Sequence, residues 1–68
     1  IMMTAHNSLG AQLRAIRLAK GITTYKLAEL TGLKQPNIVR AEKGGGLTLA
    51  TLTKIAGALG YRLEIVKA

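Results

Sequence analysis

Four short runs of helical periodicity, each closed by a glycine, constrain this chain more than any other feature. Within each run apolar residues recur three or four positions apart, as they do on one face of an α-helix. The closing glycines tolerate the left-handed backbone with which helices commonly end, and they are Gly21, Gly32, Gly44 and Gly60. The pattern predicts an all-α domain of four short helices over residues 8–60.

The starts of these helices carry signals of their own. Ser8, Thr23 or Thr24, and Thr48 can cap the first, second and fourth helices, because a hydroxyl oxygen accepts a bond from an early helical N–H. Pro36 falls in the first turn of the third helix, which begins near Lys34 or Gln35. The expected apolar faces are Leu9, Leu13, Ile16, Leu18 with Ala15 and Ala19; Leu27, Ala28 and Leu30; Ile38 and Ala41; and Leu49, Leu52, Ile55, Ala56 and Leu59.

The two ends of the chain lack the helical pattern of residues 8–60. Residues 1–7 are expected to form a flexible leader. After Gly60 the period changes to two, because Tyr61, Leu63 and Ile65 alternate with Arg62, Glu64 and Val66, which is typical of a β-strand. The chain contains no second strand to pair with it, and an unpaired edge invites pairing with another chain. We therefore expect residues 61–68 to form a dimerisation strand, with a homodimer joined through Tyr61–Val66.

Composition narrows the class of protein. A chain of 68 residues suffices for one domain that is marginally stable alone, so a partner subunit would help. Ten Lys and Arg stand against three acids, a net charge of +7 that favours a polyanionic partner, although a chance imbalance on a solvated surface is the plain alternative. Cysteine is absent. No signal peptide or membrane-length apolar run is seen, so a cytoplasmic protein is expected.

The segment from Thr24 to Ala41 carries the functional signal. Gly32 supplies a turn between two helices that meet steeply, and Leu27 and Ile38 can hold them on the rest of the domain. One face of the later helix is then free, and it carries Gln35, Asn37 and Arg40, with Lys34 and Lys43 at its ends. Arg, Asn and Gln make paired hydrogen bonds to base edges in the major groove, while Lys and helix N-termini suit phosphates. Gln35 or Asn37 taken alone is better explained by solvation than by base contact; together, on one helix of a chain with a net charge of +7, they predict DNA contact.

Several motifs resemble one family in order and spacing. They are Leu13-Arg14-Ala15-Ile16-Arg17, Leu27-Ala28-Glu29-Leu30-Thr31-Gly32-Leu33, Ile38-Val39-Arg40-Ala41-Glu42-Lys43-Gly44 and Thr51-Leu52-Thr53-Lys54-Ile55-Ala56-Gly57-Ala58-Leu59-Gly60. Over residues 8–60 the chain resembles the Cro/C1-type (XRE) helix-turn-helix domain, with its lambda-repressor-like fold. The strand-like tail is similar to that of HipB-type antitoxins.

The resemblance implies a transcriptional repressor that binds a palindromic operator as a dimer. By position, Gln35, Asn37 and Arg40 would read bases, while Thr24 and Lys43 would contact phosphates. It also implies a buried ion pair between Arg17 and Glu42. The chain departs from the family in three places: Lys34 stands where Ser or Thr is usual before the third helix, Thr24 replaces a common Gln, and Ala41 is smaller than the usual apolar residue.

Three other classes of protein are alternatives to a DNA-binding regulator. An enzyme is disfavoured, because the single His6 lies in the leader, Glu29, Glu42 and Glu64 form no obvious pair, and the glycine run lacks the Gly-Lys-Ser/Thr of a phosphate loop. A membrane-surface helix would need one strongly basic face, whereas the cations here are spread along the chain. An antitoxin that binds a toxin remains an alternative compatible with DNA binding. No cofactor or metal is implied.

Overall fold

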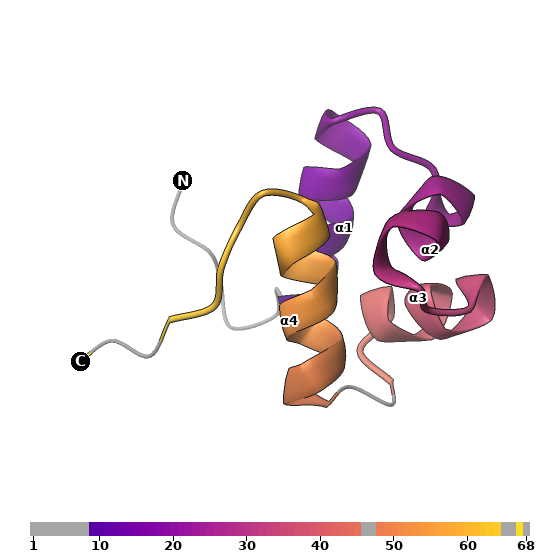
Figure 1. Ribbon diagram of the computed structural model, residues 1–68. Helices are drawn as coiled ribbons and strands as arrows, with labels where there is room; N and C mark the ends of the chain where they lie inside the picture. The colour runs from indigo at the N-terminus through magenta and orange to yellow at the C-terminus, as the bar shows by residue number, and fades with distance from the viewer. Residues whose placement is uncertain (1–8, 46–47, 65–66, 68) are drawn as a thin grey trace.

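The computed structural model describes residues 9–45, 48–64 and 67, and in these residues it contains four helices and no strand. They are α1 (Leu9–Ala19), α2 (Thr24–Thr31), α3 (Gln35–Glu42) and α4 (Leu49–Ala58). Helices α2 and α3 pack on each other, α3 also packs on α1, and α2 on α4 (Figure 1). The all-α prediction is confirmed, while the predicted leader, residues 1–7, lies outside the described residues.

Hydroxyl groups begin two of the helices as the sequence predicts. Thr23 Oγ1 accepts a bond from the Lys26 amide at 3.0 Å, so Thr23 rather than Thr24 caps α2. Thr48 Oγ1 accepts from the Thr51 amide at 3.1 Å at the start of α4. Lys34 precedes α3 without a side-chain cap, as its side chain, which has no acceptor, requires. The predicted cap Ser8 lies outside the described residues.

Three helices end in the same hydrogen-bonded turn around a left-handed glycine. Gly21, Gly44 and Gly60 have φ of +68°, +87° and +85°. In each turn the glycine amide and the next amide bond back to carbonyls of the last helical turn, which satisfies acceptors that the helix itself leaves open. The second of these bonds joins Ile22 N to Arg17 O, Gly45 N to Arg40 O and Tyr61 N to Ala56 O, at 3.1, 3.0 and 2.8 Å. The glycine stops predicted from sequence are thus confirmed.

The core lies where the helices meet, and every predicted apolar face contributes residues to it: Leu13, Leu27, Ile38, Ala41, Ile55, Ala56 and Leu59. The outer members are not buried. Leu18 and Leu30 are each 50% exposed and Leu49 is 72% exposed, and Leu9, Ala15 and Ala19 are also exposed. The sequence therefore predicted too many buried residues on each helix, because only a narrow strip of the surface of a short helix contacts its neighbours.

Gly10, which has no side chain, lies against the backbone of Ala41 on the helix opposite. Gly10 is buried in α1, and a Cβ placed there would collide with the carbonyl oxygen of Ala41 and lie 3.2 Å from its carbonyl carbon. The start of α1 therefore packs directly on the backbone at the end of α3.

After α4 the chain turns back on the side of α4 away from α2 and α3 (Figure 1). Leu63 is half-buried against the core, and Arg62 and Glu64 pair with each other on the surface at 3.2 Å. In an extended segment residues two positions apart lie on the same side. Residues 61–64 belong to no strand in this single chain, and Ile65 and Val66 lie outside the described residues. A ladder would need a second copy, so the strand stays a prediction.

Candidate nucleic-acid interface

Helix α3 has one buried and one exposed face. Ile38, Ala41 and Glu42 are buried, with Ile38 completely inaccessible. Along the rest of the helix and its flanks, the exposed residues are Lys34, Pro36, Asn37, Arg40 and Lys43, with Gln35 half-exposed. The structure thus places all five predicted residues of the α3 segment, Lys34, Gln35, Asn37, Arg40 and Lys43, outside the core.

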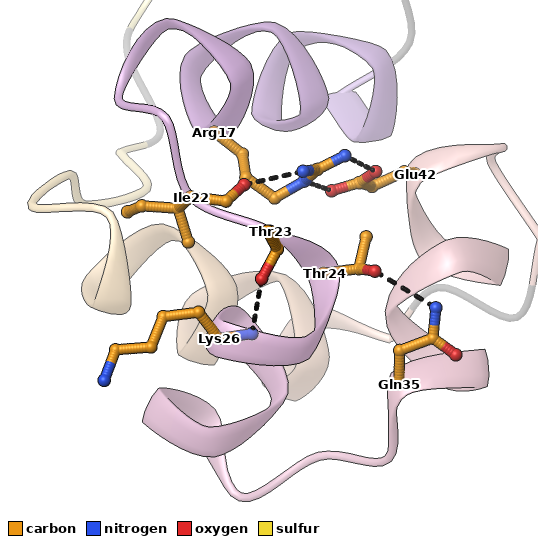
Figure 2. A network of polar contacts seen from close by, with 7 residues as sticks. All are labelled: Arg17, Ile22, Thr23, Thr24, Lys26, Gln35 and Glu42. Atoms are coloured by element: carbon orange, nitrogen blue, oxygen red, sulfur yellow. Dashed lines mark hydrogen bonds and ion pairs between the residues drawn. The ribbon is translucent and has the colours of Figure 1, made fainter.

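The sixth predicted residue, Thr24, lies at the start of α2 and contacts α3 directly. Gln35 Nε2 donates a hydrogen bond to Thr24 Oγ1 at 3.0 Å (Figure 2). Both residues are the first of their helices, so the N-termini of α2 and α3 are joined side chain to side chain. This contact was not predicted, because it joins positions eleven residues apart through a turn whose angle the sequence does not state.

The bond leaves both side chains with free hydrogen-bonding capacity. A glutamine amide has two N–H donors and a carbonyl oxygen, so Gln35 keeps one donor and its acceptor. Thr24 accepts in this bond and retains its own hydroxyl hydrogen. The pair can therefore present a donor and acceptor from Gln35 together with a donor from Thr24.

A buried ion pair fixes the far end of α3. Arg17 Nε donates to Glu42 Oε2 at 2.6 Å and Arg17 Nη2 to Glu42 Oε1 at 3.0 Å. A third donor, Nη1, reaches the Ile22 carbonyl at 2.7 Å (Figure 2). Both charged residues are 7% exposed. The pair predicted from the family pattern is confirmed, while the Ile22 contact carried no signal in the sequence.

Two apolar residues were missed as members of the exposed face. Pro36 is exposed and Val39 half-exposed, and Val39 lies one helical turn beyond Gln35, so the two share a side of α3. Apolar groups contact the methyl group of thymine in the major groove. The four-residue spacing from Gln35 was the signal that could have identified Val39.

The surroundings of this face favour an anion. The chain carries a net charge of +7, and three exposed cations lie on or beside α3: Lys34, Arg40 and Lys43. Within residues 9–45, 48–64 and 67 no group of three potential metal ligands comes together. No helix in that part of the chain is long and apolar enough to cross a membrane.

Two helices joined by a glycine turn, with the second anchored from behind and polar in front, define a helix-turn-helix DNA-binding domain. A family model described as helix-turn-helix matches residues 13–66. The chain therefore belongs to the Cro/C1-type (XRE) helix-turn-helix family, whose members are DNA-binding transcription regulators and not enzymes. A comparison with curated proteins found no significant match.

Proposed function

We propose that this protein is a sequence-specific transcription repressor that binds a palindromic operator as a homodimer, with α3 in the major groove. The observation that carries the proposal is the Gln35–Thr24 hydrogen bond of 3.0 Å. It holds a base-reading side chain at the N-terminal end of α3, which is the end that contacts base edges in helix-turn-helix proteins.

Gln35 is suited to adenine. Adenine presents an acceptor, N7, and a donor, N6–H₂, in the major groove, and a glutamine amide matches both. The bond to Thr24 uses the second amide hydrogen of Gln35, so orientation and base contact do not compete. Thr24 can at the same time donate its hydroxyl hydrogen to a phosphate oxygen.

Arg40 and Asn37 extend the reading surface. Both are exposed on α3, and Arg40 lies five residues beyond Gln35, further along the groove. Arg pairs with the two acceptors of guanine, and Asn, like Gln, pairs with adenine. Lys34 and Lys43 flank the helix and would bind phosphates, which positions the protein without specifying sequence.

The dimer would form through residues 61–68, and three features support this arrangement. Residues 61–64 lie on the side of α4 away from α3 (Figure 1), Tyr61 is 52% exposed, and Leu63 borders an open apolar groove with Leu9 and Leu49. Pairing Tyr61–Val66 with its copy around a two-fold axis would cover these groups and leave both α3 helices free. A symmetric dimer requires a symmetric site, and occupying an operator suffices for repression.

In vitro selection of bound DNA tests the proposal. The expected product is a palindrome whose half-sites are centred about one helical turn, roughly 34 Å, apart. Enrichment of an asymmetric site would contradict the dimer, and absence of any enriched sequence would contradict specific reading.

Toxin binding is the second candidate. An antitoxin needs a protein-binding surface beyond α3, and the large hydrophobic side chains exposed on the first two helices include Leu18, Tyr25 and Leu30. Substituting Leu18 and Leu30 with Ser should then abolish neutralisation of a toxin encoded beside this gene while leaving operator affinity unchanged. Retained neutralisation would exclude this surface.

A further inference from the structure

The turn that ends α3 differs from its two counterparts in one residue. In this kind of turn, the residue after the left-handed glycine faces the helical residue whose carbonyl it bonds, and side chains at these two positions frequently touch. That following residue is Ile22 after α1 and Tyr61 after α4, but Gly45 after α3. The facing residue in the α3 turn is Arg40.

The backbone does not require glycine at this position. Gly44 has the left-handed φ of +87°, whereas Gly45 is not among the glycines with positive φ, so alanine could adopt its conformation. What a side chain would meet is Arg40. A Cβ on Gly45 would lie 3.2 Å from Arg40 Cγ and 3.8 Å from Cδ.

The aliphatic stem of Arg40 thus lies over the Gly45 backbone, in the space that a side chain occupies in the other two turns. The loop beneath it is held firmly, because the Gly45 and Lys43 amides both donate to the Arg40 carbonyl, at 3.0 and 3.1 Å. If a methyl group were added at Gly45, the freely rotating stem would yield before the hydrogen-bonded loop.

We propose that Gly45 is a positioning residue for Arg40. Because Gly45 has no side chain, the aliphatic part of Arg40 can pack on its backbone, and this packing directs the guanidinium along the exposed face of α3. This inference rests on the proposed role of Arg40 in reading DNA. It gives the middle glycine of Gly44-Gly45-Gly46 a role in specificity, separate from the helix stop that Gly44 provides.

The test is a double-mutant cycle on the operator obtained by selection, using Gly45→Ala, Arg40→Ala and both together. Gly45→Ala should weaken binding by about three- to tenfold, and the double variant should bind like Arg40→Ala alone, because interacting residues are not additive. Gly57→Ala is the matched control, since Gly57 lies in α4 with nothing within 4 Å of an added Cβ. It should leave affinity unchanged.

Two outcomes of the cycle would overturn the inference. If Gly45→Ala weakens binding equally with and without Arg40, the glycine acts by itself, for instance by letting a phosphate approach the loop. If Gly45→Ala lowers the melting temperature so far that loss of folded protein accounts for the weaker binding, then Gly45 has only a structural role.

A measurement without DNA separates this inference from the proposed function. In the NMR spectrum of the free protein, nuclear Overhauser effects should join the Gly45 α-protons to the Arg40 γ-protons, and Gly45→Ala should change the Arg40 side-chain couplings. Absence of these nuclear Overhauser effects would refute the packing of the Arg40 side chain on Gly45. Contacts that are present while Arg40→Ala binds DNA normally would instead refute base reading by Arg40.

Discussion

Arg17, in the last turn of α1, and Glu42, the last residue of α3, meet at two pairs of atoms, 2.6 and 3.0 Å apart. The third donor of Arg17 satisfies the Ile22 carbonyl at 2.7 Å, and no buried side-chain polar atom in the described residues lacks a partner. A single guanidinium therefore joins α1, the turn that follows it and α3.

Removing one charge of this pair should destabilise the fold severely. Glu42→Ala leaves the Arg17 guanidinium buried without its counter-charge, which should cost about 3–5 kcal/mol in the free energy of unfolding. Glu29→Ala is the control, since its pair with Lys26 is exposed and 3.4 Å long and should contribute at most about 1 kcal/mol. Chemical denaturation measures both. An unchanged midpoint for Glu42→Ala would show that the pair does not hold α3.

The packing of α1 on α3 should also be sensitive to one added methyl group. Gly10→Ala places a Cβ against the Ala41 carbonyl, so the helices must separate, and overpacking of this kind costs about 1–3 kcal/mol. Gly57→Ala meets nothing in α4 and should stabilise by up to about 1 kcal/mol, the difference in helix propensity. Opposite shifts in melting temperature are expected; a stabilising Gly10→Ala would refute the close approach.

Salt should weaken DNA binding steeply. Each phosphate neutralised contributes about 0.9 to the slope of log affinity against log salt, and Lys34 and Lys43 are proposed to neutralise one each. Lys34→Ala and Lys43→Ala should therefore each lower the slope by about one and weaken binding to every sequence alike. The exposed Lys54, which lies on α4 outside both α3 and the proposed dimerisation segment, provides the control. A slope unaffected by either substitution would remove these residues from the phosphate contacts.

Truncation after Gly60 tests the dimer. Without Tyr61–Val66 the protein should sediment as a monomer and lose most of its affinity for the full palindrome while keeping weak half-site binding. Circular dichroism must first show that the four helices remain, because Leu63 packs on the core. A folded, truncated protein that still dimerises would place the interface elsewhere, with α4 the next candidate.

The sequence predicted the local parts of this fold well. Thr23, Thr48 and the glycines that end the helices act within four or five residues of the chain, so their effects can be inferred from neighbours alone. The core was predicted where periodicity had a clear centre, at Leu13, Leu27 and Ile38, and wrongly at its edges. The exposure of Leu18 or Leu30 depends on how much of the surface of α1 or α2 the neighbouring helices cover.

The site could be predicted as a set of residues but not as an arrangement. Placement of Gln35, Asn37 and Arg40 outside the core followed from helical spacing relative to Ile38. The bond from Gln35 to Thr24 and the contact of Gly45 with Arg40 depend on the angles of two turns, which residue type does not fix. Arg17–Glu42 was predicted only because the family pattern implied it.

The most direct test of base reading by α3 compares Gln35→Ala and Arg40→Ala on the selected operator and on every single-base-pair variant of it. Each substitution should cost about 1–3 kcal/mol on the operator and remove the preference at its own base pair, leaving the other positions still discriminated. An equal loss on all sequences, with every preference retained, would contradict the account, because Gln35 and Arg40 would then contact only phosphates.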